Sequence, residues 1–150
     1  MTKGNLFKTV STVHIESIAN ATWSSFAILD KMQDSFSSAY IEKVRISYVL
    51  NEEEAEPNTG LLFVSSLDNT LSATASANDG QIISATASRG GGGVVVLPIQ
   101  RSIRNNASVS NSSQAGDPIY LHARAAVIGE TTSVYMVIET WGRWHKVESL

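Results

Sequence analysis

The three histidines of this 150-residue chain are its best candidates for proton transfer or metal binding. No pair among His14, His122 and His145 has the spacing of a metal-binding motif, and the chain has no cysteine to complete such a site. The many serines include none within the Gly-x-Ser-x-Gly turn that exposes a catalytic nucleophile. We therefore expect the histidines to lie at the surface or in an interface, and we expect no metal site.

Carboxylate groups could act in pairs as general acid and base, as in glycoside hydrolysis. No spacing singles out such a pair among the candidates, which are Glu16, Glu42, Asp68, Glu130 and Glu139. The acidic segment 52–56 could bind calcium through its four glutamates, but it lacks the alternating Asp/Asn spacing of a dedicated calcium loop. Glutamates at this density repel one another, so a solvated loop is the favoured interpretation.

Arg89 precedes four consecutive glycines, a composition that suggests a phosphate-binding loop. Such a loop needs a lysine and a serine or threonine after the glycines, followed by a helix. Here Val94 and two further valines follow instead, which favours a flexible hairpin tip. We therefore expect that the chain is not an enzyme and that it needs no cofactor.

Large aromatic residues gather near the C-terminus and alternate with apolar ones. Tyr135 and Trp141 share one face of the expected strand, and Val134, Met136 and Ile138 share the other. If the second face forms the core, the first presents aromatic and arginine side chains, which are typical of protein interfaces. The candidate interface residues are Tyr120, His122, Arg124, Tyr135, Trp141, Arg143 and Trp144.

Other interpretations of these aromatic residues remain open. Trp141, Trp144 or Tyr120 could stack on a sugar ring, which would make the chain a carbohydrate-binding, lectin-like β-sandwich. The outward face could also be a second buried face beneath a long loop. A β-sandwich hydrolase is a more distant alternative.

Eight strand-like segments, separated by turn signals, must position these residues. Their ranges are 8–18, 22–29, 40–50, 60–66, 81–88, 94–104, 117–128 and 133–147. The third segment has the clearest period of two, because Val44, Ile46, Tyr48 and Leu50 share one face of it. Such alternation is typical of a strand with one face in the core.

Short strands at this spacing are typical of a β-sandwich or a barrel, and eight is the number of strands in a jelly roll. Pro98 indicates that its strand lies at a sheet edge or contains a bulge. The segment 30–39 is the one helix candidate. We predict a single all-β domain over residues 1–150, an eight-stranded antiparallel jelly-roll β-sandwich in which 8–18 pairs with 133–147.

The composition is poor in charge and rich in hydroxyl groups, with 17% charged residues and 32 serines and threonines. Such a surface fits either harsh extracellular conditions or burial against other copies of the chain, although β-proteins also favour these residues. The net charge of −3 predicts weak, non-specific nucleic-acid binding at most. The longest apolar run, 94–99, is too short to span a bilayer, and the N-terminus has no apolar signal region.

Three sequons for N-glycosylation begin at Asn20, Asn106 and Asn111. In a chain this rich in serine and threonine, such matches arise by chance. They therefore identify neither a host nor a compartment.

The eight strands, the long polar loops and the segments 116–124 (GDPIYLHAR) and 135–141 (YMVIETW) resemble small single jelly-roll viral capsid proteins. The resemblance implies two four-stranded sheets and a structural subunit that assembles in many copies into an icosahedral shell, located in the virion. Many capsid proteins that wrap nucleic acid have an N-terminal arm rich in arginine and lysine. Here Lys3 and Lys8 are the only such residues among the first 30.

Without such an arm, the chain is more similar to coat proteins of icosahedral viruses with an internal membrane, whose shell does not condense the genome. The partners that this resemblance implies are other copies of the chain and other capsid proteins, with the membrane nearby. Direct, strong nucleic-acid binding is not expected.

Overall fold

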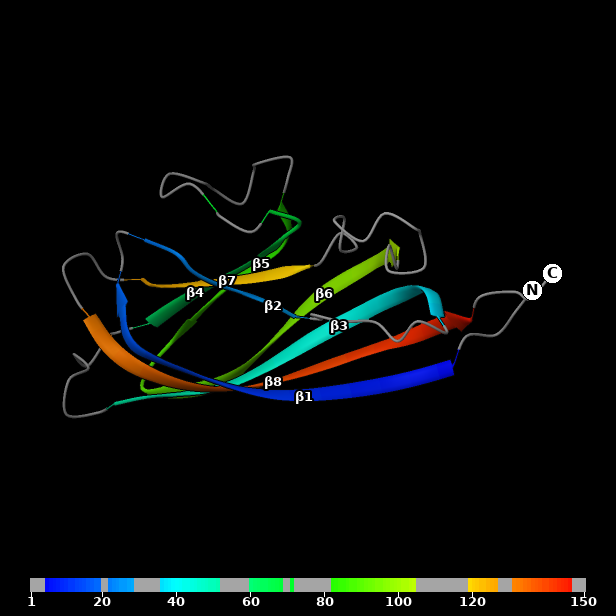
Figure 1. Ribbon diagram of the computed structural model, residues 1–150. Coiled ribbons are helices and arrows are strands. Elements are labelled where there is room, and N and C mark those ends of the chain that lie inside the picture. The colour runs from blue at the N-terminus through cyan, green and yellow to red at the C-terminus, as the bar shows by residue number, and fades with distance from the viewer. Residues whose placement is uncertain are drawn as a thin grey trace.

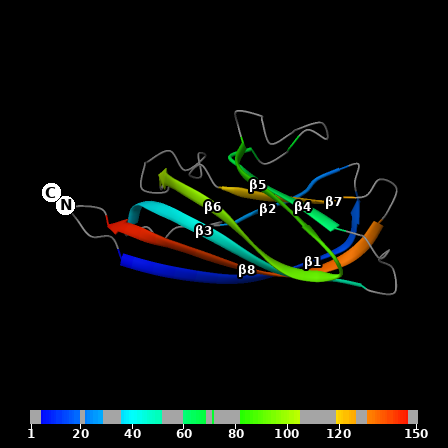
Figure 2. The same ribbon diagram turned by 180° about the vertical axis from the view of Figure 1, so that it is seen from behind.

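The computed structural model describes residues 5–19, 22–28, 36–51, 60–68, 71, 82–104, 119–126 and 131–146. Eight strands make up most of this part of the chain (Figures 1 and 2). They are β1 (Asn5–Ala19), β2 (Ser24–Ala27), β3 (Phe36–Leu50), β4 (Gly60–Ser66), β5 (Ile82–Arg89), β6 (Gly92–Arg104), β7 (Tyr120–Ala125) and β8 (Thr131–Lys146). The predicted all-β fold is confirmed, and each predicted strand has a counterpart.

The strands form two four-stranded sheets, one above the other in Figure 1. One sheet has the order β1-β8-β3-β6 and the other the order β2-β7-β4-β5, with all neighbours antiparallel. The chain crosses between the sheets at every connection except β4 to β5. The first and last strands, β1 and β8, lie side by side in one sheet. This is jelly-roll topology. The predicted pairing of the two ends is confirmed, with Val13 opposite Met136.

The segment 30–39, the one helix candidate of the sequence, is not helical where the structure describes it, because 36–39 are the first residues of β3. Ala39 and Ile41 are both fully buried, with the partly exposed Tyr40 between them. Burying alternate side chains requires the two-residue period of a strand, which overrides local helix propensity. Some predicted features lie outside the described residues: 30–35, the acidic segment 52–56, and the sequons at Asn20, Asn106 and Asn111.

Pro98 has the position that its chemistry predicts. It lies in β6, an edge strand of its sheet, where a missing backbone donor leaves no neighbouring strand unpaired. A bulge follows it, because the register passes from Lys43 opposite Pro98 to Ile41 opposite Arg101. Gln100 within this bulge has φ 50°, in the left-handed region. The sequence-based prediction of an edge or a bulge is therefore confirmed on both counts.

The core lies between the two sheets and follows from the alternation along the strands. Ile46, Tyr48 and Ile138 of one sheet pack against residues such as Phe63 of the other, and all four are almost completely buried. The Tyr48 and Phe63 rings lie 5.7 Å apart, and the Tyr48 hydroxyl lies 2.6 Å from Oγ of Ser88. Burial of each large apolar side chain contributes about 1.5–3 kcal/mol, so this layer dominates the stability of the fold.

Gly142 is the position in β8 where a side chain would have no room. A Cβ atom there would lie 2.6 Å from two ring carbons of Phe7 and still closer to the carbonyl oxygen of Tyr40. Phe7 of the neighbouring β1 fills this space and stacks on Trp144, with ring centroids 4.4 Å apart. The glycine thus allows two aromatic rings to cover one end of the core.

No helix in the described ranges is long and apolar enough to cross a membrane.

Candidate interaction surface

The outer face of the β1-β8-β3-β6 sheet is the most unusual surface in the described part of the chain. It carries every large hydrophobic residue that is exposed there: Leu6, Val10, Val49, Val94, Val96, Tyr135 and Val137. The exposed fraction reaches 70% for Leu6 and 59% for Tyr135. Scattered exposed apolar residues are ordinary, but a set confined to one face is typical of an interaction site.

Cross-strand register arranges these residues in rows across the sheet. Val137 lies between Thr12 of β1 and Ser47 of β3, and Ser47 pairs in turn with Val94 of β6. Successive outward residues on a strand lie about 7 Å apart, so neighbouring rows are in contact. The rows therefore form one continuous surface.

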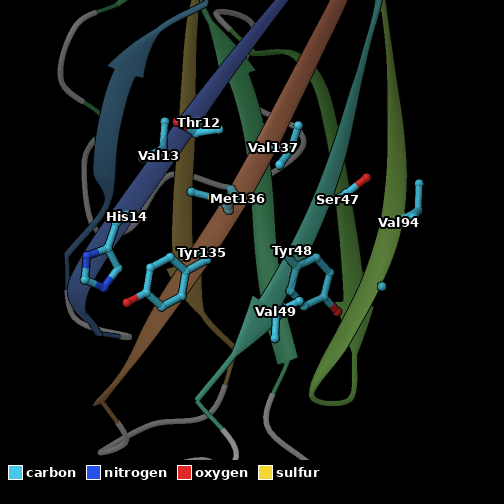
Figure 3. Close-up of a pocket in the computed structure, with 11 residues that line it drawn as sticks. Thr12, Val13, His14, Ser47, Tyr48, Val49, Val94, Tyr135, Met136 and Val137 are labelled. Carbon is cyan, nitrogen blue, oxygen red and sulfur yellow. The ribbon is translucent and has the colours of Figure 1, made fainter.

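The next row places Tyr135 between His14 and Val49. The His14 and Tyr135 rings are stacked, with centroids 4.1 Å apart and planes 3° from parallel (Figure 3). These two rows line a groove of about 720 Å³ on the outer face, together with Met136 and other residues of the sheet. The groove is mainly apolar, as a site for a partner's side chains would be.

A charged and aromatic row lies further along the sheet. Trp141 is flanked by Lys8 and Lys43, whose Nζ atoms lie 5.2 Å and 5.1 Å from its ring centroid. Glu139 in the adjacent row forms an ion pair with Lys8, with 2.7 Å between Oε2 and Nζ, and a longer one with Arg45, with 3.9 Å between Oε1 and Nη1. The hydrogen bond from Lys8 and the two positive charges hold the pKa of Glu139 below its usual value. Glu139 therefore stays ionised at neutral pH and remains paired with Lys8.

The seven candidate interface residues divide between the two sheets. Tyr135, Trp141 and Arg143 lie on the outer face described above, as alternation along β8 predicts. Trp144 has the opposite parity and packs on the core beside Phe7. The remaining three, Tyr120, His122 and Arg124, lie on the outer side of β7 in the other sheet. The structure therefore does not bring the seven together.

His122 differs from the expectation that the histidines lie at the surface or in an interface, because its side chain is completely buried. Its Nδ1 lies 2.6 Å from Oγ of Ser25 in β2, and its Nε2 lies 2.7 Å from Oγ of Ser66 in β4. Burial lowers the pKa of His122, although the backbone of Asp68 and its charge oppose this shift. A neutral imidazole donates through one nitrogen and accepts through the other, so it satisfies both serines.

This arrangement makes His122 a link between three strands. A serine and a histidine at this distance also occur in nucleophilic sites, but here both ring nitrogens are occupied and Ser66 is itself fully buried. Nearby, Arg124 lies over the ring of Trp23, with 4.5 Å from its guanidinium carbon to the centroid. Across the described ranges, no group of three or more His, Asp or Glu residues is placed to hold a metal ion.

The rings proposed as sugar-stacking platforms have neighbours in the structure. Trp144 is partly buried and stacked on Phe7. The ring of Trp141 has a lysine ammonium close by on each flanking strand. The Tyr120 ring lies 6.4 Å from that of His122. A carbohydrate would have to displace the lysines from Trp141 or bind only at its edge, so the geometry does not favour the lectin-like alternative.

Sequence reasoning missed most of the apolar surface. Val10, Val49, Val94 and Val96 were not singled out, because valine is expected in strands and says nothing about which face it occupies. One signal was present in the run 94–97, which is apolar at successive positions and must therefore place valine on both faces of β6.

Comparison with known proteins identifies a fold. No family model matches the chain, and no curated protein matches its sequence. A chain in the structure of maize chlorotic mottle virus superposes with a TM-score of 0.54 at 11% identity, covering 98% of this chain and 97% of that one. A chain of cocksfoot mottle virus gives 0.53 at 8% identity, with 95% and 97% covered.

The BFDV capsid protein, in the crystal structure of its 60-mer, gives a TM-score of 0.51 at 10% identity. The match covers 100% of this chain and 98% of that one. At such low identity these likenesses concern the fold alone. The chain therefore has, over nearly its whole length, the jelly-roll fold that these viral chains share.

Proposed function

We propose that the chain is a structural capsid protein that self-assembles into an icosahedral shell and is located in the virion. The observation that carries this proposal is the exposed apolar face on a sheet that belongs to a jelly roll spanning nearly the whole chain. A subunit that works by association needs such a surface and no reactive site. The full-length fold likeness to the capsid protein of a 60-mer supports the same conclusion.

The surfaces proposed for contact with neighbouring subunits lie on both sheets. On one sheet they comprise Tyr135, Trp141 and Arg143, and on the other Tyr120 and Arg124. His122 and Trp144 support these surfaces from beneath, because the first is fully buried and the second packs on the core. Exposed aromatic and arginine side chains are the residues that most often dominate binding energy at interfaces.

We propose further partners from the resemblance to small jelly-roll capsid proteins. They are other capsid proteins and a nearby internal membrane, as in icosahedral viruses whose shell does not condense the genome. The net charge of −3 supports weak binding to nucleic acid at most. The absence of a nucleophile elbow and of cysteine in the sequence supports a role without enzymatic activity.

The test is the assembly state of the purified protein. Size-exclusion chromatography with negative-stain electron microscopy should reveal shells, rings or other large symmetric species as concentration rises. A protein that stays monomeric at high concentration and binds a specific sugar on a glycan array would contradict the proposal and favour the carbohydrate-binding alternative.

A further inference from the structure

Charged residues are distributed unevenly along the strands on the outer face of the β1-β8-β3-β6 sheet. One end carries Lys8, Lys43, Arg45 and Arg143, opposed there by Glu139 and by Glu42, which is exposed at the β3 bulge beside Lys43. The opposite end of β1 carries the exposed Glu16. The apolar rows thus separate a positive end of the face from the carboxylate of Glu16.

The centre of the face lies between these ends. Thr12 is four residues from Lys8 and four from Glu16 along β1, and it pairs with Val137. Val137 pairs with Ser47, which is likewise four residues from Lys43. This middle row, Thr12–Val137–Ser47–Val94, contains only small apolar and hydroxyl side chains. It is therefore the natural position for a symmetry axis.

We propose that this face binds the same face of a second copy, through a two-fold axis that runs along the middle row, perpendicular to the strands. Such an axis reverses the strand direction, so Lys8 of each copy meets Glu16 of the other, and the apolar rows meet in the middle. The inference rests on the proposed self-association and specifies one of its contacts. A two-fold contact uses the same patch on both partners and requires it to be self-complementary, which the Lys8 and Glu16 positions and the apolar rows provide here.

The alternative two-fold axis, parallel to the strands, is electrostatically worse. It would place the row of Lys8 and Lys43 against the same row of the second copy, which gathers four ammonium groups. Like charges brought together across an interface cost several kcal/mol. The perpendicular axis separates the positive ends and places Lys8 of each copy opposite Glu16 of the other.

The amount of surface also suits a second copy. Seven large apolar side chains, each at least 39% exposed, lie on this one face together with Trp141 and the lysine stems. A stable interface takes about 800 Å² from each partner, which requires an extended surface such as the outer face of a four-stranded sheet. In a closed shell a two-fold axis points to the centre, so this contact sets both sheets edge-on to the shell surface.

Cross-linking tests the register directly, because the chain has no cysteine of its own. Lys8→Cys and Glu16→Cys proteins, mixed in dilute solution with a short bis-maleimide, should form a mixed covalent dimer. Lys8→Cys alone should cross-link little. Ala87→Cys, exposed on β5 of the other sheet, is the matched control and should stay uncoupled to Glu16→Cys. Equal coupling of all pairs would overturn the proposal.

Charge reversal gives a second readout, and a thermal melt of each variant measures the separate effect of losing the Lys8–Glu139 ion pair within the subunit. Lys8→Glu or Glu16→Lys alone should weaken dimerisation in sedimentation equilibrium by about tenfold or more, because each creates two like-charge contacts. The double variant restores both pairs across the axis and should dimerise about tenfold more tightly than Lys8→Glu, which lacks the same Lys8–Glu139 ion pair. If the double variant is as weak as Lys8→Glu, the register is wrong.

The outcomes separate this inference from the proposed function. Shells without the mixed Lys8→Cys–Glu16→Cys cross-link would overturn the face-to-face contact and leave the capsid role standing. A cross-linked dimer that never grows into larger species would support the contact and contradict the capsid role. A monomer at all concentrations would overturn both.

Discussion

Replacing Trp141 by alanine should separate the association surface from the core. Trp141 and Ile138 lie three residues apart on β8 but on opposite faces of it. Ile138 is 2% exposed and part of the core, whereas Trp141 faces outward between Lys8 and Lys43. We expect Ile138→Ala to damage folding and Trp141→Ala to damage assembly.

The structure sets the size of each effect. Truncating a buried isoleucine costs about 2–5 kcal/mol, and for a domain of this size each kcal/mol lowers the melting temperature by about 2–4 °C. The Trp141→Ala substitution removes two cation–π contacts, with Lys8 and Lys43, worth about 0.5–1 kcal/mol each at an exposed site. Its alanine variant should therefore lose at most about 2 kcal/mol of folding stability, but 2 kcal/mol or more of binding at each contact, which is about 30-fold in affinity.

The assay pairs thermal melts of the isolated subunit with light scattering or electron microscopy of assembly. The Trp141→Ala protein should melt cooperatively, close to the unaltered protein, and assemble only at much higher concentration. If it melts as early as Ile138→Ala, the Trp141 side chain belongs to the core and the face assignment is wrong. If neither folding nor assembly changes, the association surface lies elsewhere.

Three further predictions concern stability. Because burial lowers the pKa of His122, the folded state binds fewer protons than the unfolded state; the free energy of unfolding should fall as the pH drops below 6.5 and level off below the lowered pKa. Denaturant titrations should show less of this loss between pH 7 and pH 5 in His122→Gln, and an equal loss would contradict the assignment. Gly142→Ala should cost about 2–4 kcal/mol in the same titrations, since its Cβ would overlap Phe7 and a backbone carbonyl; an unchanged midpoint would show that the strands can move apart. Tyr48→Phe should cost about 1 kcal/mol through the lost hydrogen bond to Ser88, and Ser88→Ala should add little to it, whereas full additivity would mean that the two groups act separately.

Much of the fold could be predicted from alternation along single strands. Period-two patterns in β3, β7 and β8 indicated which side chains enter the core, and the positions of Ile46, Leu121 and Ile138 agree with them. The helix candidate failed at 36–39 because local propensity there is outweighed by the burial of Ala39 against the other sheet. The outward positions of Tyr135 and Trp141 also follow from alternation along β8. Predicting the face of a residue requires only the period of its own strand and no information about the neighbouring strands.

Tertiary structure decided everything that depends on strands distant in sequence. His122 is buried between Ser25 and Ser66, which lie 97 and 56 residues away, and no pattern within β7 indicates those partners. The outer face of the β1-β8-β3-β6 sheet likewise requires the register of four strands. Lys8, Trp141 and Lys43 meet on it only because β1, β8 and β3 pair. Side-chain alternation is a property of one strand and can be predicted from sequence. Pairing between strands is chosen by the free energy of the whole sandwich, and it alone gathers scattered valines and lysines into a surface that another molecule can bind.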